Sequence, residues 1–449
     1  MRVLLDLQPL QGPSRDRGIG RYTLEHARAF LRLCDDPVAV MNSSDMDAVE
    51  AASRELGLSG DRLRVFSLPA VFKGGAPVWI DSCLSGKSAV YDAVLEAFAS
   101  NLRPDFMLSY SVLEFIGSFS PVKRLGRIPF GAVVYDFIPY HDRKMLSGWL
   151  ERPYLARLGE MRGADLLFCI SEFTALEAEG ILGAPKKSLR VISSGKSPFW
   201  KRVSLTEGEE MEFRKRRSLP GPFIMYSGGS DERKNVRRLI EAYASLGGGL
   251  GSSFGLFVVC GGNRAAEREL SAYAARIGAK GASFAGNVSD EELRAACSLC
   301  SLFVFPSLSE GFGLPPLEAM SCGAPTIASN VTSLPEVIGL QRALFDPESV
   351  DSIRAKIEEA LLDGDFYEEL KRHALERSAM FSWDVSAERP MEAIRGLSPS
   401  RESYEPVSEE ECMDVVAGIL RGLRADDRLI AKAAACIADN FDSLRGIEK

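Results

Sequence analysis

Three absences limit the kind of protein that this sequence encodes. No run of about 18 consecutive apolar residues occurs in the 449 residues, so we expect no membrane-spanning helix. The apolar stretch after Met1 is too short for a secretory signal and instead predicts a first strand. Basic residues do not exceed acidic ones, and the net charge of −8 argues against nucleic acid as the main partner. We therefore expect a cytoplasmic protein, and leave open a peripheral association with the inner face of the cell membrane.

Cysteine is present, but without the spacing of a disulfide framework or a metal site. The 9 cysteines lie at irregular positions, several of them inside apolar runs, which is typical of reduced core residues. Cys297 and Cys300 form a single Cys-x-x-Cys with no second pair, which does not favour a metal or redox role. Asp45 and Asp47 mimic a metal-binding Asp-x-Asp, but they open a helix-like segment, where aspartate is a common cap. We expect no metal and no cofactor.

Short apolar runs alternate with helical patterns along the chain, which predicts an α/β protein with two mainly parallel sheets. A stretch near residues 193–221, which includes the charged segment Glu207–Arg217, predicts the linker between two domains. We expect strands at Val3–Leu7, Phe106–Ser109, Phe130–Tyr135, Leu166–Ile170, Arg190–Ile192, Phe223–Ser227, Gly255–Cys260, Ser283–Ala285, Leu302–Pro306 and Pro325–Ala328. The expected domains are 1–200 and 201–380, followed by a helix at 381–397 and a helical, acidic tail or linker at 398–449.

A glycine-containing loop follows the first expected strand. Gly18 and Gly20, flanked by Arg17 and Arg21, precede an amphipathic helix. A dinucleotide fingerprint needs a third glycine, but position 23 is Thr23. This departure argues against an NAD-dependent oxidoreductase, and a plain strand-to-helix turn remains an alternative for the loop.

The most informative stretch runs from Glu310 to Glu318, directly after an apolar strand. Pro316 suits a first helical turn, so Gly311 and Gly313 lie between the carboxyl end of a strand and the N-terminus of a helix. Backbone N–H groups at such a place favour an anion. A carboxylate that binds hydroxyls beside a phosphate site indicates a pocket for a nucleotide sugar. The alternative is a strand–turn–helix junction with solvated glutamates.

A second loop supplies positive charge. Gly228 and Gly229 end an expected strand and allow a ligand to approach the backbone closely. Arg233 and Lys234 follow just before a helix, where guanidinium can grip phosphate oxygens in pairs and ammonium acts as a compact charge. The alternative is a surface turn with solvated charges.

The Glu310-x7-Glu318 spacing, with Gly-Phe-Gly-Leu-Pro inside it, resembles the signature of retaining glycosyltransferases of the family 4 type. The resemblance covers about residues 1–397 and implies the GT-B architecture, in which two Rossmann-like, doubly wound domains face a cleft. Phe381-Ser-Trp383 and the helix after it resemble the family's last helix, which crosses back onto the N-terminal domain. The C-terminal helical extension is not explained by the family, and it somewhat resembles the connector before a second transferase module.

The stretch from Tyr135 to Pro139 narrows the resemblance. Many family members carry histidine just before the aspartate that is Asp136 here. Tyr135 takes that place, which resembles the Tyr-Asp-x-Ile-Pro variant of bacterial polysaccharide and O-antigen mannosyltransferases. The resemblance implies that Asp136 contacts the sugar or an acceptor hydroxyl, and we expect His141 to be a local structural residue.

The resemblance also assigns roles. It implies metal-independent catalysis by Glu310, Asp136, Lys234 and Arg233. The donor side would comprise Gly18, Gly20, Gly228, Gly229, Asn287, Val288, Gly311, Phe312, Gly313, Leu314 and Glu318. Candidates for the acceptor side are Arg17, Arg21 and Tyr135.

We therefore expect a retaining glycosyltransferase that moves a sugar, foremost α-mannose from GDP-mannose, to a growing bacterial polysaccharide or lipid-linked glycan. The expected partners are the nucleotide sugar and the glycan acceptor, with association to an assembly complex left open. A UDP-sugar or another GDP-sugar is the alternative donor. An alternative of another class is a catalytically silent module that binds glycan or assembly partners.

Overall fold

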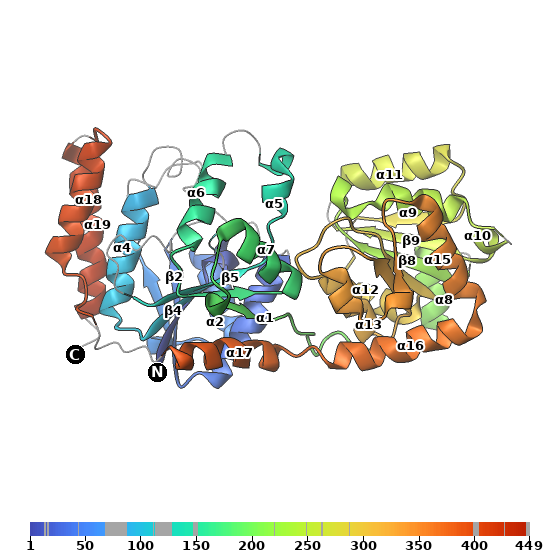
Figure 1. Cartoon of the computed structure of the whole chain (residues 1–449), viewed down its shortest axis with the longest axis horizontal. Helices are drawn as coiled ribbons and strands as arrows, with labels where there is room; N and C mark the ends of the chain where they lie inside the picture. The colour runs from blue at the N-terminus through green and yellow to red at the C-terminus, as the bar shows by residue number, and fades with distance from the viewer. Residues whose placement is uncertain are drawn as a thin grey trace. The chain divides into compact units, whose positions relative to one another are not determined.

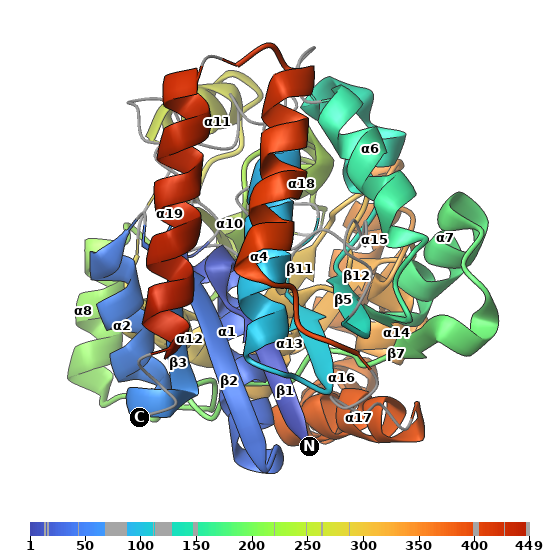
Figure 2. The same cartoon turned by 90° about the vertical axis from the view of Figure 1, so that its left-hand side faces the viewer.

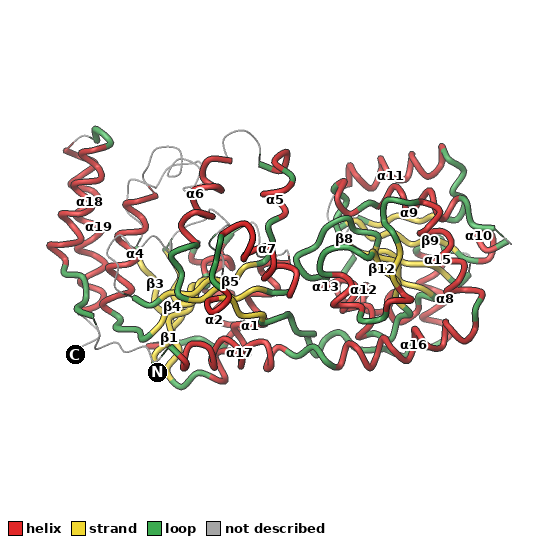
Figure 3. Tube along the Cα trace, in the orientation of Figure 1, coloured by secondary structure: helices red, strands yellow, loops and turns green. Residues whose placement is uncertain are grey.

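The computed structural model describes residues 1–12, 15, 18–43, 45–67, 88–110, 112, 128–146, 151–219, 221–247, 249–261, 264–286, 288–397, 404–425 and 427–445. The chain divides into two compact units. The first contains Met1–Ile170, Thr174–Ser193 and Trp383–Lys449, and the second contains Ser171–Phe173 and Ser194–Ser382. Within each unit, helices lie on both faces of a parallel sheet (Figure 1, Figure 3).

The first unit is built on a seven-stranded sheet with the order β3-β2-β1-β4-β5-β6-β7. Its strands are β1 (Arg2–Asp6), β2 (Asp36–Asn42), β3 (Leu63–Phe66), β4 (Phe106–Ser109), β5 (Phe130–Val134), β6 (Leu166–Cys169) and β7 (Leu189–Val191). All neighbours pair in parallel. The sequence predicted five of these strands and missed β2 and β3. Strand β2 begins with Asp-Pro shortly after a helix, which is not a typical strand start. Strand β3 is short and half-exposed at the sheet edge, so it lacks a continuous apolar run.

The second unit has a six-stranded sheet with the order β10-β9-β8-β11-β12-β13. Its strands are β8 (Phe223–Gly228), β9 (Gly255–Cys260), β10 (Ala282–Ala285), β11 (Leu302–Phe305), β12 (Thr326–Ser329) and β13 (Leu344–Phe345). The order reverses between β8 and β11, which is the place where open parallel sheets bind ligands. The expectation of two doubly wound, Rossmann-like sheets is confirmed, and only the two-residue β13 was missed.

The helices of the first unit include α1 (Gly18–Leu33), α2 (Met46–Leu56), α4 (Ser88–Asn101), α5 (Ile138–His141), α6 (Glu151–Met161), α7 (Glu172–Leu182) and α17 (Trp383–Gly396). Asp45 caps α2, and its Oδ1 accepts a hydrogen bond from the Ala48 amide at 2.9 Å. The Asp-x-Asp triplet is therefore a helix start, as expected. None of the helices in the described part of the chain is both long and apolar enough to cross a membrane.

Helix α17 follows the second unit in sequence but packs in the first unit, against α1. The ring of Trp383 meets that of Tyr22 edge-on at 5.0 Å. His26 is buried beneath, with Nε2 3.2 Å from the carbonyl oxygen of Ser386. Burial lowers the pKa of His26 to about 4, so this imidazole is a neutral core residue.

The C-terminal tail forms two helices, α18 (Glu409–Gly422) and α19 (Asp427–Arg445), which pack together and against α4 (Figure 2). Leu420 and Ile437 lie in the hydrophobic core of the first unit. Asn440 of α19 anchors this helix to the backbone of Ser67. Its Oδ1 accepts a hydrogen bond from the Ser67 amide at 2.8 Å, and its Nδ2 donates one to the Ser67 carbonyl at 3.0 Å. The tail is thus part of the first unit's core.

The second unit carries α8 (Glu207–Arg216), α9 (Val236–Ala244), α10 (Leu250–Ser253), α11 (Arg264–Arg276), α12 (Asp290–Leu299), α13 (Leu314–Ser321), α14 (Leu334–Ile338), α15 (Val350–Leu362) and α16 (Gly364–Ala379). The charged segment expected as a linker is helix α8 instead. Thr206 and Glu209 form a capping box at its start, and Phe213 buries its ring 6.1 Å from that of Phe223. Phe213 is its only buried residue, so the segment has little helical periodicity and the sequence did not indicate a helix here.

Candidate functional site

The loop after β8 is held in one shape by contacts that fix its two ends. The Tyr226 hydroxyl donates to the Gly229 carbonyl at 2.7 Å and fills the space beside Gly228, where an added Cβ would lie 2.5 Å from it. Asn235 adopts a left-handed conformation with φ of 59°. Its Nδ2 donates to the carbonyl oxygens of Pro306 and Pro347 at 3.0 and 2.8 Å. The cations at positions 233 and 234 are thereby presented at the carboxyl end of β8.

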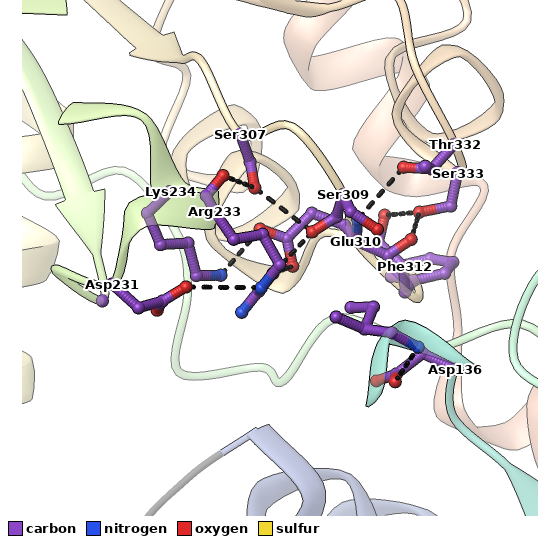
Figure 4. A network of polar contacts seen from close by, with 12 residues as sticks. Asp136, Asp231, Arg233, Lys234, Ser307, Ser309, Glu310, Phe312, Thr332 and Ser333 are labelled. Carbon is purple, nitrogen blue, oxygen red and sulfur yellow. Dashed lines mark hydrogen bonds and ion pairs between the residues drawn. The ribbon is translucent and has the colours of Figure 1, made fainter. Parts of the chain in front are cut away.

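Arg233, Lys234 and Glu310 form one ionic cluster (Figure 4). The Lys234 Nζ lies 2.6 Å from Glu310 Oε1, and the Arg233 Nη1 lies 3.2 Å from Glu310 Oε2. The same Arg233 nitrogen donates to the Ser309 carbonyl at 2.5 Å, and Asp231 pairs with the guanidinium at 3.4 Å. Two loops about 75 residues apart in sequence therefore meet because β8 and β11 are neighbours in the sheet.

The Glu310 carboxylate is nearly buried, with only 10% of its side chain exposed. Burial alone would raise its pKa, but the charges of Lys234 and Arg233 outweigh burial and hold the pKa below the ordinary value. Glu310 is therefore an anion at neutral pH, and its oxygens can only accept hydrogen bonds. Such a group suits a hydroxyl-rich ligand.

Two residues that the motif did not single out fix the loop that carries Glu310. The Glu310 amide donates to the Thr332 hydroxyl oxygen at 3.1 Å. The Ser333 hydroxyl lies 2.9 Å from the Glu310 carbonyl and 2.8 Å from the Phe312 carbonyl. Neither residue lies in the motifs of the sequence analysis, and no local sequence pattern indicates the left-handed φ of 53° at Thr332.

The glycine loop leads directly into α13. Gly313 has a φ of 116°, and a Cβ there would lie 2.9 Å from the side chain of Leu334, so glycine is required on two counts. Helix α13 begins at Leu314 with proline in its first turn, as predicted, and it ends before Gly323. Phe312 is buried beside the helix start, and Glu318 is half-buried one turn into the helix. Because Pro315 and Pro316 carry no backbone N–H, the start of α13 can offer an anion only the amides of Gly313 and Leu314 and the positive end of the helix dipole.

In the first unit, the tyrosine that replaces the family histidine connects two elements. The Tyr135 hydroxyl lies 3.3 Å from the Thr23 hydroxyl of α1, and its ring meets that of Tyr22 edge-on. Asp136 follows β5 and accepts a hydrogen bond from the Ile138 amide at 3.0 Å. His141 pairs with Glu177 at 2.5 Å, consistent with the local role expected for it.

The remaining predicted residues lie in the two units as follows. Gly18 and Gly20 begin α1, and a Cβ at Gly20 would lie 2.1 Å from the Arg15 carbonyl oxygen. Arg21 is half-buried in α1, and Val288 is half-buried just before α12. Arg17 and Asn287 lie outside the described residues.

The segment that carries the ionic cluster is similar to a known protein family. Residues 208–377 match the model of the family described as glycosyl transferases group 1. The serotype-specific mannosyltransferase WbdA of Escherichia coli is 32% identical over 444 residues, which are 96% of this chain and 52% of that protein. The O-antigen chain mannosyltransferase B of Escherichia coli is 36% identical over 177 residues, which are 39% of this chain and 46% of that protein. The chain spans about half the length of these relatives.

Solved structures share the fold. Anabaena Alr3699/HepE, in complex with UDP and glucose, matches with a TM-score of 0.64 at 17% identity, over 88% of this chain and 100% of that chain. Sucrose-phosphate synthase from Thermosynechococcus elongatus matches with a TM-score of 0.64 at 20% identity, over 89% and 99%. The chain therefore has the GT-B fold, and its residues 208–377 are similar to the group 1 glycosyl transferases.

Proposed function

We propose that this chain transfers α-mannose from GDP-mannose, with retention of the anomeric configuration, to a growing bacterial polysaccharide or lipid-linked glycan. The observation that carries the proposal is the cluster of Glu310 with Arg233 and Lys234 beside the start of α13. The names of two similar proteins, both mannosyltransferases of Escherichia coli, favour mannose among the hexoses.

The donor diphosphate would lie between the basic pair and the N-terminus of α13. Arg233 and Lys234 have more donors than Glu310 can accept, so they can hold phosphate oxygens while they remain paired with it. Negative charge grows on the diphosphate as the bond to the sugar breaks, and preorganised cations stabilise that charge. Removing one such group typically slows turnover about a hundredfold, or about 3 kcal/mol.

The carboxylates would hold the sugar parts of the donor. Glu310 accepts from hydroxyls of the transferred sugar, and Glu318 accepts from the ribose hydroxyls. The leaving phosphate would take the proton of the acceptor hydroxyl on the face from which it departs, which retains the configuration. Asp136 would contact a sugar or acceptor hydroxyl, with Tyr135 and Arg21 on the acceptor side.

A UDP-sugar donor is the second candidate, because a protein of the same fold is described in complex with UDP-glucose. A silent binding module is disfavoured by the intact cluster, since a binding role alone does not need two cations aimed at one buried carboxylate.

Thermal unfolding in the presence of nucleotides tests the proposal. GDP and GDP-mannose should raise the midpoint by a few degrees, because a ligand at a hundred times its Kd stabilises by about 2.7 kcal/mol. UDP and UDP-glucose serve as the matched controls. If only the uridine nucleotides raise the midpoint, the donor is a UDP-sugar and not GDP-mannose. If none of the nucleotides raises it, the silent binding module is favoured.

A further inference from the structure

A carboxylate outside the ionic cluster lies over the same edge of the second sheet. Glu267 belongs to the first turn of α11, and a Cβ built on Gly286 would lie 2.7 Å from its Oε2. Gly286 directly follows β10. The Glu267 charge also raises the pKa of the Cys260 thiol, second to burial, which places the carboxylate near the carboxyl end of β9 as well. Glu267 thus lies at the carboxyl ends of two neighbouring strands.

Among the described residues, small side chains line the sheet edge on this side of the cluster. Glycines stand after β8, β9 and β10, and a Cβ on Gly261 would lie 3.6 Å from the Gly228 carbonyl. On the opposite side, the loop after β12 fills the edge, because Thr332 and Ser333 bond to the Glu310 loop. A nucleotide whose diphosphate lies at the β8–β11 reversal would therefore extend its base towards β9 and β10, on the side of Glu267.

Within the described part of the chain, no ion pair or hydrogen bond explains the position of the Glu267 carboxylate. Arg264 lies one turn before it, and its Cγ would be 3.9 Å from the same Gly286 Cβ, yet the two residues form no ion pair. No described residue donates a hydrogen bond to the Glu267 carboxylate, although Glu269 on the same helix pairs with Arg237. A favourable helix dipole explains an acid in the first turn, but not why its carboxylate turns to Gly286.

We propose that Glu267 selects the base of the donor nucleotide by accepting two hydrogen bonds from guanine. An ionised carboxylate only accepts, and it has two oxygens side by side. Guanine presents two adjacent donors, N1–H and the 2-amino group. Uracil presents one N–H between two carbonyl oxygens, which a carboxylate repels. The inference rests on the proposed use of GDP-mannose and names the residue that would set that choice.

Hypoxanthine nucleotides isolate this contact because they lack only the 2-amino group. We would measure the Kd of GDP, IDP and UDP for the whole chain by calorimetry, for wild type, Glu267→Gln and Glu267→Ala. Wild type should bind GDP about tenfold or more tightly than IDP, as expected for a hydrogen bond to a charged group. Both variants should weaken GDP about tenfold or more, and they should bind UDP at least as tightly as wild type does, because the charge that repels the uracil carbonyls is gone. In Glu267→Ala, the GDP-to-IDP ratio should fall close to one.

Glu269→Gln is the control, because it removes the same charge from the same helix at an exposed surface ion pair and should change none of these constants much. Unchanged melting temperatures would show that the variants fold. If wild type binds GDP and turns over GDP-mannose while Glu267→Ala keeps the GDP-to-IDP ratio, the inference is overturned and the proposed function stands. If wild type binds UDP but not GDP, the proposed donor and the inference both fall.

Discussion

The Lys234 Nζ lies 2.6 Å from Oε1 of Glu310, so a cation from the loop after β8 neutralises a nearly buried carboxylate from the loop after β11. The contact joins two loops of one sheet edge. It makes the two residues interdependent, since the loss of either leaves the other charge with fewer partners at low exposure.

Lys234→Ala should lower turnover at least tenfold, and about a hundredfold if the ammonium stabilises the leaving diphosphate. Glu310→Ala should also lose at least tenfold because the sugar hydroxyls lose their acceptor. The measurement is the initial rate of nucleotide release from the donor. Lys371→Ala on α16 is the control, because its ion pair with Glu368 is exposed. Near-normal rates in both site variants would remove the site assignment.

The ionic cluster should make the stability of the second unit depend on pH. The pKa of Glu310 is lowered in the folded chain, so its contribution is present above the ordinary glutamate pKa of about 4.3 and is lost as the pH falls through the folded value. Wild type should therefore lose more stability than Glu310→Gln when the pH falls below about 4.3. Denaturant unfolding of both proteins across this range measures the difference, and parallel curves would contradict the role of the cluster.

A second pH dependence should come from the first unit. His26 accepts from or donates to the Tyr110 hydroxyl at 2.8 Å and lies against the Ser386 carbonyl, both of which suit a neutral imidazole. Its pKa is lowered to about 4 from 6.5. The unfolded chain binds the proton first, so this stability is complete above pH 6.5 and is lost as the pH falls towards 4.

Over that range wild type should lose about 3 kcal/mol more than His26→Gln, which has no group to titrate. Urea unfolding followed at several pH values measures this difference. His373→Gln on the other unit serves as the control and should track wild type. Equal losses in wild type and His26→Gln would show that His26 does not titrate on unfolding.

The tail helices should be needed for the stability of the first unit. Leu420 is fully buried in the core that α18 and α19 share with α4, and Leu420→Ala should cost about 2–5 kcal/mol. Leu423→Ala lies three residues further on, where 40% of the side chain is exposed, and should cost far less. Urea unfolding of the two variants tests this, and equal small costs would show that the tail docks only loosely.

The residues of the cluster could be predicted from the sequence because each lies at a fixed, short distance after a recognisable strand. Arg233 and Lys234 follow a strand that ends in glycines, and Glu310 follows another strand. Ligand groups in parallel sheets gather at the carboxyl ends of strands, so their proximity followed once both strands were recognised. The two domains were visible for the same reason, since buried parallel strands are short apolar runs.

Other features depend on contacts between distant segments and leave no local pattern. Thr332 supports the Glu310 amide from 22 residues away through a left-handed backbone conformation. Asn440 pairs with Ser67, which lies 373 residues earlier in the chain. The sequence predicted that the tail is helical, but it did not predict that the tail packs against α4. The sequence also gives no indication of a role for Glu267, because a glutamate in the first turn of a helix is common.

The most direct test of the account is the reaction itself, followed with GDP-mannose as donor and methyl α-mannoside as acceptor. We predict that the chain releases GDP as it forms a longer mannoside, that NMR shows the new linkage to be α, and that Lys234→Ala slows release about a hundredfold. Release from uridine nucleotide sugars alone, or a β-linked product, would contradict the proposed donor or the retaining course.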